Sequence, residues 1–306
     1  MAHLMRWRVV LATMLLAVTM PAVAATDDRL RIGIKGDIAS LDPHVLNETL
    51  TLGVLSNVME GLVRRDADLK LRPGLATRWE TLSPLHWRFH LRKGVRFHDG
   101  TPFTASDVLF TFERVRKPRS QMRSRIPDGA RIIAVDAHTV DVHLEKPNPI
   151  LPANWESLLI MSRPWAERHG LADPGAVPQS APDLPANGTG PYQVISHRTG
   201  QVMHFERHTM WWGEARGLAT RVDLFTLANA QTRTAALLSG QVDLIVPAPV
   251  QDLARISATD GFKTVTGAEL RTIFLNMDQM REELAGAPVG TANPFMDRRV
   301  RQAVYH

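Results

Sequence analysis

The sequence predicts an α/β fold, and three stretches of the chain support that class. Residues 85–91 alternate strictly between apolar and polar side chains, which indicates a half-buried strand. Thr104 and Asp107 have the spacing of a capping box, and apolar residues at helical spacing follow them, which indicates a helix. Residues 222–246 have the pattern of strand, helix and strand, for which a parallel right-handed crossover between neighbouring strands is the usual connection.

The strand at 85–91 places its apolar side chains on one face, namely Leu85, Trp87, Phe89 and Leu91. Its other face includes His86 and His90, which we interpret as part of a solvated strand surface. After the strand, Asp99-Gly100 has the composition of a tight turn. The helix that begins after Thr104 gathers its apolar residues on one side, namely Val108, Leu109, Phe112 and Val115.

The remaining elements follow from the same two periodicities. Strands are predicted over 30–34, 132–135, 140–144, 193–196, 201–207 and 270–275. Helices are predicted over 50–62, 150–161 and 250–256, and from 297 to the end of the sequence. In the hairpin over 132–144, the side expected to be buried carries Val140, Val142 and Leu144. The proline-rich stretch 172–188 is predicted to be a surface loop.

Composition narrows the classes of function. The 306 residues suggest about two domains, and a hydrophobic content of 44% suffices for sizeable cores. The chain has no cysteine, which excludes disulfides, cysteine-based metal sites and a cysteine nucleophile. The formal charge of +5 is scattered along the chain, so we expect no nucleic-acid partner. The motifs G-x-S-x-G, H-E-x-x-H and the phosphate-binding loop are all missing.

Residues 1–24 are predicted to be a signal peptide. Arg6 and Arg8 precede an apolar run over 9–18 that is too short to span a bilayer. Ala22-Val23-Ala24 then forms a small-residue cleavage site, so cleavage is expected between Ala24 and Ala25. A membrane anchor is the less favoured alternative. We therefore expect an exported protein, most simply a periplasmic one.

A long motif carries a resemblance to a known family. The order W-x-F-x-L-R-x-G-V-x-F-x-D-G-x-P-x-T-A-x-D-V over 87–108 resembles the signature region of extracytoplasmic solute-binding proteins that serve ABC importers. The resembled subgroup binds dipeptides, oligopeptides and nickel complexes. Shorter matches are S-L-D-P-H at 40–44, L-R-P-G-L-A at 71–76 and G-T-G-P-Y at 188–192, followed by W-W at 211–212. The alternative is a generic hairpin and helix that match by chance.

The resemblance implies a periplasmic-binding-protein-like fold of class II, with a mixed-sheet lobe, helices and an inserted subdomain. Lobe I would comprise 25–45 and 186–268, and the inserted subdomain would comprise 46–185. Residues 269–306 would begin a second main lobe that is incomplete here. Family members continue for about a further lobe, so we expect either a truncated gene product or a fragment. Such a chain is expected to bind peptides weakly or not at all and to expose apolar surface.

The resemblance also implies a ligand site between the lobes. The candidate residues follow the first strand and lie near the predicted crossover, namely Asp37, Ile38, Ala39, Arg271, Thr272 and Phe274. Asp37 could pair with a ligand ammonium and Arg271 with a carboxylate in a bidentate fork. The alternative is that each is an exposed charge at a strand end.

The function implied is non-enzymatic capture of a solute, without a cofactor, by a monomer that delivers it to an ABC permease. Chemoreception is an alternative that the sequence does not separate from import. Peptides are the first choice of ligand, ahead of nickel chelates, glutathione-like thiols and opines.

An alternative from another class is a secreted metal-dependent hydrolase that uses His204, Glu206 and His208. The alternation of Met203 to Glu206 favours a strand there, and a solvated strand face explains these residues more simply. Trp211 and Trp212 could stack on a ligand, but packing is the favoured interpretation. Asp42 could contact a ligand, but a cap on the following turn is the favoured interpretation.

Overall fold

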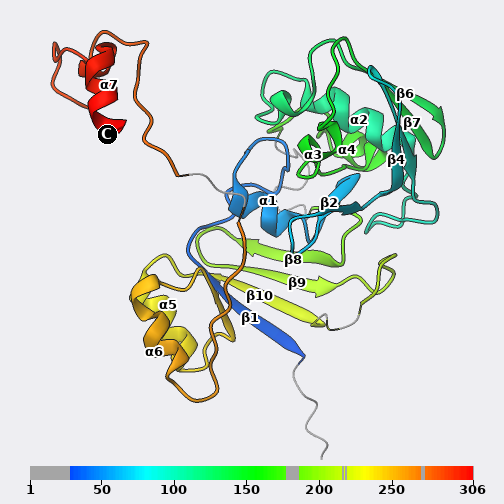
Figure 1. Cartoon of the computed structure of the whole chain (residues 1–306). Helices are drawn as coiled ribbons and strands as arrows, with labels where there is room; N and C mark the ends of the chain where they lie inside the picture. The colour runs from blue at the N-terminus through cyan, green and yellow to red at the C-terminus, as the bar shows by residue number, and fades with distance from the viewer. Residues whose placement is uncertain (1–27, 177–185, 216, 218, 270–272, 306) are drawn as a thin grey trace, which may run out of the picture.

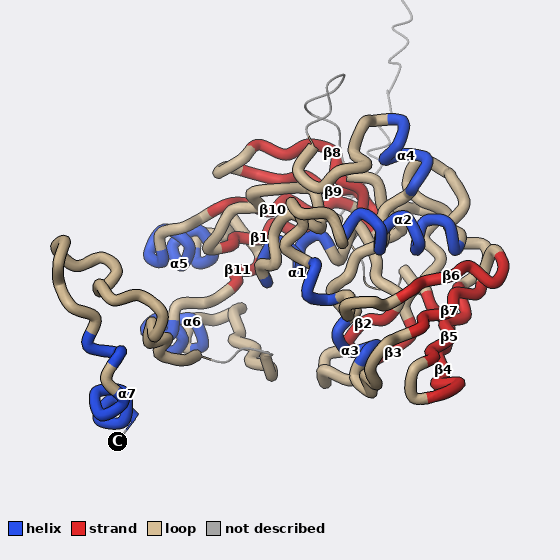
Figure 2. The backbone as a smooth tube through the Cα atoms, turned by 90° about the horizontal axis from the view of Figure 1, so that it is seen from above, coloured by secondary structure: helices blue, strands red, loops and turns tan. Residues whose placement is uncertain are grey.

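The computed structural model describes residues 28–176, 186–215, 217, 219–269 and 273–305, and these form three β-sheets with helices around them (Figures 1 and 2). The strands are β1 (Arg29–Ile34), β2 (Val63–Arg65), β3 (Leu71–Pro73), β4 (Ala76–Ser83), β5 (His86–Leu91), β6 (Arg131–Asp136), β7 (Thr139–His143), β8 (Tyr192–Arg198), β9 (Val202–Arg207), β10 (Arg221–Thr226) and β11 (Leu244–Val246). The α-helices are α1 (Thr49–Leu55), α2 (Ala105–Val115), α3 (Leu151–Asn154), α4 (Arg163–Arg168), α5 (Ala230–Leu238), α6 (Leu253–Ser257) and α7 (Arg298–Tyr305). Short 3₁₀ turns are η1 (Arg123–Arg125), η2 (Val250–Asp252) and η3 (Pro294–Met296).

The first sheet has five strands in the order β11-β1-β10-β9-β8. β1 pairs in parallel with both β10 and β11, whereas β8, β9 and β10 are antiparallel neighbours. The predicted unit over 222–246 is therefore a parallel strand–helix–strand, but its strands are not neighbours, because β1 lies between them. The crossover spans two strand spacings of about 4.8 Å each instead of one. A local sequence pattern does not encode that difference.

The two faces of this sheet pack against different cores. Side chains of β8, β9 and β10 enter the large core that continues under the second sheet, and they include Val194, Phe205 and Leu224. The opposite face is covered by α5 and α6, whose cluster is Ala236, Leu237, Val242, Ile245 and Ile256. Figure 1 shows these helices beside the sheet, on the side away from α2.

The second sheet has four antiparallel strands in the order β4-β5-β7-β6. The predicted alternation in β5 is confirmed, since Trp87, Phe89 and Leu91 are buried. Leu85 is an exception, because it lies in the turn before β5 and is 39% exposed. The predicted apolar face of the hairpin β6–β7 is also buried, namely Val140, Val142 and Leu144.

α2 begins as the sequence predicts and packs against the core of the second sheet. The carboxylate of Asp107 accepts a hydrogen bond from the backbone N–H of Thr104 at 2.8 Å, which is the reciprocal half of a capping box. Trp155 lies at the centre of this core, with its ring 5.2 Å from that of Phe89 and 4.5 Å from that of Phe112. Aromatic pairs at these separations are favourable contacts.

Two predicted helices are much shorter than expected. The helix predicted over 50–62 ends at Leu55, although Val58, Met59 and Leu62 beyond it are buried. The helix predicted over 150–161 is the single turn α3. Both segments leave the helical path to pair with each other, because Gly61 bridges Leu159 and the N–H of Ile160 donates to the carbonyl of Glu60 at 2.9 Å. Apolar spacing alone does not report such a long-range pairing.

The last described segment, 273–305, ends in α7 and lies apart from both large sheets (Figures 1 and 2). α7 confirms the predicted final helix, and Asp297 accepts a hydrogen bond from the backbone N–H of Arg299 at 2.8 Å at its start. In the described part of the chain, no helix combines the length and the apolar character needed to cross a bilayer. The predicted signal peptide and most of the predicted loop at 172–188 lie outside the described residues.

Gly188 and Gly190 make the closest backbone approach in this part of the fold. The segment that leads into β8 runs against the residues after α1, and the N–H of Gly190 donates to the carbonyl of Val58 at 2.9 Å. A Cβ atom added at Gly188 would lie 2.0 Å from the carbonyl oxygen of Val58. This contact explains why the G-T-G-P-Y motif needs glycine there.

Replacing Gly188 with alanine is expected to lower the free energy of unfolding by about 1–3 kcal/mol, the usual cost of an overpacked site. Denaturation by urea measures this change. Gly267→Ala is the matched control, because a Cβ there meets no atom within 4 Å. Equal urea midpoints for the two variants would contradict the close approach at Gly188.

Candidate functional site

The three parallel strands of the first sheet end at one edge. β1, β11 and β10 end at Ile34, Val246 and Thr226. The chain after each end stays close, since the N–H of Leu227 donates to Ile34 at 2.8 Å and that of Lys35 donates to Val246 at 3.2 Å. In open α/β sheets, ligands bind beyond the carboxyl ends of parallel strands. This edge is therefore the candidate ligand edge.

Asp37 lies in the loop after β1, beside the end of β10. Its Oδ1 accepts a hydrogen bond from the Thr226 hydroxyl at 3.3 Å and lies 4.0 Å from Nε2 of His197. The side chain keeps 28% of its surface exposed, so a ligand can reach the carboxylate. Such a group can accept a charge-assisted hydrogen bond from an ammonium.

The other candidate residues differ in how far their side chains are exposed, and two of them lie outside the described part of the chain. Ile38 is 2% exposed and belongs to the large core, so its side chain anchors the loop, whereas Ala39 is exposed. Arg271 and Thr272 lie outside the described residues. Phe274 is 73% exposed.

The strand predicted over 270–275 is not formed at residues 273–275, which have no regular structure. Ile273, Phe274 and Leu275 are all largely exposed. A lone extended segment with no neighbouring strand does not form a ladder, so its apolar composition alone does not make it a strand. Residues 270–272 lie outside the described part of the chain.

A buried ionic network holds the loop that follows Asp37. Arg114 on α2 donates to both carboxylate oxygens of Asp42, at 2.8 and 2.5 Å, and its own side chain is fully buried. The same guanidinium bonds the Nδ1 atom of His44 at 2.7 Å and the carbonyl of Leu171 at 2.9 Å. The network therefore ties the loop after β1 to α2 and to the segment after α4.

The charges in this network are set by burial and by Arg114. Burial by itself would raise the pKa of Asp42, but the hydrogen bond and the positive charge of Arg114 outweigh it and hold that pKa below its ordinary value. Burial, reinforced by Arg114, lowers the pKa of His44 to about 4. Since Nε2 of His44 lies 3.0 Å from the carbonyl of Leu159, the neutral ring donates there and accepts from Arg114.

Asp42 confirms the predicted turn cap, because its Oδ1 accepts from the N–H of His44 at 3.0 Å. Sequence reasoning missed its ion pair with Arg114. The two residues are 72 positions apart, and no local pattern links them.

Trp211 and Trp212 hold a half-buried carboxylate. Both indole N–H groups donate to Glu60, at 3.4 and 2.7 Å, and the hydroxyl of Thr189 donates at 2.8 Å. Burial raises the pKa of Glu60, although these hydrogen bonds oppose the shift. The guanidinium of Arg92 lies 3.9 Å from the centre of the Trp212 ring. The favoured interpretation, packing instead of ligand stacking, agrees with these contacts.

The proposed hydrolase triad does not assemble. Nδ1 of His204 lies 2.6 Å from Oδ1 of Asp223, an acid that also binds Arg29. His208 is 4% exposed, bonds Gln193 at 3.2 Å and packs its ring 4.9 Å from that of His98. The described His, Asp and Glu residues include one group close enough to share a metal ion, and it is a different one, formed by His86, Asp141 and His143.

The comparisons with known proteins agree with this architecture. A family model described as bacterial extracellular solute-binding proteins, family 5 Middle, matches residues 70–306. The glutathione-binding protein GsiB of Salmonella choleraesuis (strain SC-B67) is 24% identical, and the match covers 93% of this chain and 52% of that protein. The periplasmic murein peptide-binding protein MppA of Escherichia coli (strain K12) is 23% identical over 92% of this chain and 53% of its own length.

Solved structures show the same fold. The periplasmic binding protein AgaA of A. tumefaciens R10, in complex with agropinic acid, superposes with a TM-score of 0.67 at 27% identity, over 76% of this chain and 46% of that one. The Haemophilus influenzae protein OppA, in complex with the peptide RPPGFSPFR, gives a TM-score of 0.66 at 25% identity, over 76% and 48% of the two chains.

The chain spans about half the length of the curated relatives that it matches. The motif over 87–108 lies inside the part that the family model matches. The fold is that of the periplasmic binding proteins. The chain therefore belongs to the bacterial extracellular solute-binding proteins of family 5.

Proposed function

We propose that this chain belongs to the extracytoplasmic solute-binding component of an ABC importer, which captures peptides or similar small solutes without changing them. The supporting observation is the partly exposed carboxylate of Asp37 at the carboxyl edge of three parallel strands, in a chain of this family. Relatives support the class of ligand, because two are named for binding glutathione and murein peptide and two were solved in complex with agropinic acid and a peptide.

In this proposal, the ligand edge forms one wall of a cleft. Asp37 would accept a hydrogen bond from a ligand ammonium, and Arg271 would bind a carboxylate in a bidentate fork. Ala39, Thr272 and Phe274 would complete the contact, with Ile38 supporting the loop from the core. Ligand binding would shift an equilibrium between open and closed forms.

The remaining assignments are part of the same proposal. The protein is periplasmic after loss of residues 1–24, acts as a monomer and docks on permease subunits. One solved relative is described as an ABC-transporter-associated periplasmic binding protein, DppA of Helicobacter pylori, in complex with the peptide STSA. Lobe I over 25–45 and 186–268 would carry the ligand edge, with 46–185 inserted and 269–306 beginning lobe II.

Changing Asp37 to asparagine is expected to remove the preference of the chain for a free ammonium group. Since binding by this chain is expected to be weak, NMR titration is the suitable measurement. With the wild type, a tripeptide should shift the amide signals of residues 35–39 more strongly than its N-acetylated form does. The wild type should bind the free tripeptide about 10-fold or more tightly than the acetylated one, and Asp37→Asn should bind both equally. That ratio corresponds to a charge-assisted hydrogen bond of about 1.5–3 kcal/mol.

Asp260→Asn, which changes an exposed acid elsewhere on the same part of the chain, should keep the preference. If the wild type shows shifts at the ligand edge but no preference for the free ammonium, only the role of Asp37 is refuted. If millimolar peptide or glutathione shifts other residues but leaves 35–39 and 226–229 unshifted, the proposed ligand edge itself is wrong.

A further inference from the structure

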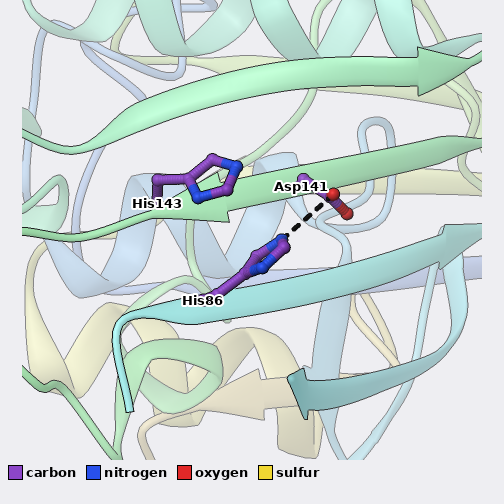
Figure 3. Close-up of side chains that lie close together, drawn as sticks. All are labelled: His86, Asp141 and His143. Carbon is purple, nitrogen blue, oxygen red and sulfur yellow. Dashed lines mark ion pairs between the residues drawn. The ribbon is translucent and has the colours of Figure 1, made fainter. Parts of the chain in front are cut away.

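The second sheet carries a histidine pair on the face turned away from its core. His86 on β5 and His143 on β7 lie directly opposite each other in the antiparallel register, and Asp141 is two residues before His143. Because side chains alternate along a strand, Asp141 and His143 share one face of β7. The buried side chains Trp87, Val140 and Val142 occupy the opposite face. Figure 3 shows the three polar side chains gathered between the two strands.

These side chains are close enough to act together. The Nε2 atom of His86 lies 3.0 Å from Oδ2 of Asp141. The rings of His86 and His143 stack with their centres 4.1 Å apart and their planes 29° apart. One ligand atom from each of the three residues can be chosen so that all lie within 4.8 Å of one another.

The Nε2 atom of His86 is also shielded from solvent. Although it lies close to Asp141, its orientation gives no hydrogen bond to any described atom. A buried polar atom left without a hydrogen bond is costly in a folded protein. A bound cation would satisfy this nitrogen through its lone pair.

We propose that His86, Asp141 and His143 form a binding site for a divalent transition-metal ion of the Zn²⁺, Ni²⁺ or Cu²⁺ class. Imidazole nitrogens with one carboxylate oxygen suit these ions, whereas Ca²⁺ and Mg²⁺ prefer all-oxygen sites. Three protein ligands leave a fourth position for water. The site lies on a different sheet from the ligand edge, so its ion is held by the scaffold and does not depend on the proposed transport function.

Rotation of the two rings is the rearrangement that binding requires. Around a tetrahedral zinc ion with Zn–N bonds of about 2.0–2.1 Å, ligand atoms lie roughly 3.3 Å apart. The stacked rings must turn so that their in-plane lone pairs converge on one point.

Arg88 fixes the orientation of the Asp141 carboxylate. It donates to both oxygens of Asp141, at 2.7 and 2.8 Å. Each oxygen retains a second lone pair, so Asp141 can bind a metal while Arg88 holds it from behind. Arg88 and Arg131, which is paired with His143 from β6, are the cations nearest in the register, and their charge opposes that of the ion.

The test is titration of the purified chain with zinc chloride, followed by calorimetry, and with cobalt chloride, followed by visible absorption. The wild type is expected to bind one ion saturably and to develop the absorption bands of Co²⁺ bound by nitrogen and oxygen. His86→Gln and His143→Gln should each weaken zinc binding by more than the roughly 10- to 100-fold that loss of an outer partner costs. Excess Mg²⁺ or Ca²⁺ should not compete.

His90→Gln is the matched control, because His90 lies on the same face of β5 and bonds Glu80 instead. This variant should bind zinc as the wild type does. Without zinc, each variant should unfold cooperatively near the midpoint of the wild type, which shows that it is folded. Zinc should raise the midpoint of the wild type and of His90→Gln, but not of the two ligand variants. Absence of saturable binding by the wild type, or equal binding by all four proteins, would overturn the site.

Discussion

Replacing Arg114 with alanine is expected to lower the free energy of unfolding by about 3–5 kcal/mol, the usual cost of removing one partner from a buried ion pair. The substitution leaves the carboxylate of Asp42, the Nδ1 atom of His44 and the carbonyl of Leu171 without their donor. Lysine should not restore stability, because one ammonium cannot reproduce the planar set of bonds that the guanidinium makes. Urea denaturation of the three proteins measures the differences.

Arg163→Ala is the control for this prediction. Arg163 pairs with Glu167 at the surface, where both side chains are about half exposed, so its loss should cost less than about 1 kcal/mol. A cost for Arg114→Ala as small as that of the control would show that the network does not stabilise the loop. The double variant Arg114→Met with Asp42→Leu should be less destabilised than the sum of its single changes, since the two residues interact directly.

Acidification is expected to destabilise the protein through His44, and this is the second large effect. The pKa of His44 is about 4 in the folded protein and 6.5 in its unfolded reference, because burial and Arg114 disfavour the charged ring. The unfolded chain therefore binds the proton first as the pH falls. The contribution of neutral His44 to stability is complete above pH 6.5 and is lost progressively down to pH 4. At 1.36 kcal/mol per pKa unit, the loss amounts to about 3 kcal/mol.

His44→Gln isolates this contribution, because glutamine does not titrate and still offers a donor for the carbonyl of Leu159. The free energy of unfolding of the wild type should fall by about 3 kcal/mol more than that of the variant between pH 7 and pH 4. His98 does not obscure the comparison. Burial also lowers its pKa to about 4, but it is present in both proteins. Parallel curves for the two proteins would contradict a buried neutral His44.

The lowered pKa of Asp42 acts in a different pH range. Its contribution is present above the ordinary value of 3.8 and is lost as the pH falls through the lower folded value. A plot of the free energy of unfolding against pH should therefore fall in two ranges. The first fall comes from His44, and the second, at lower pH, comes from the ion pair of Asp42 with Arg114.

Local periodicity predicted the parts of the fold that depend on neighbouring residues. The alternation in β5, the capping box of α2 and the buried face of β7 are all set within a few positions of the chain. Burial of one face makes such patterns reliable, because a shift by one residue would expose every apolar side chain of the strand.

Long-range pairing explains what the sequence did not predict. β1 lies between β10 and β11 because of contacts to residues about two hundred positions away, and residues 60–61 end a helical pattern by pairing with 159–160. The candidate metal site was missed for the same reason. His86 alone is typical of a solvated strand face, and only the cross-strand register places it against His143.

Hydrogen–deuterium exchange of this chain, with and without millimolar peptide, tests the central claim most directly. If the chain captures solutes at the carboxyl edge of β1, β10 and β11, peptide should slow exchange at residues 36–39 and 227–229, while β4 to β7 remain unchanged. Slower exchange confined to the four-stranded sheet, with none at the ligand edge, would contradict the account.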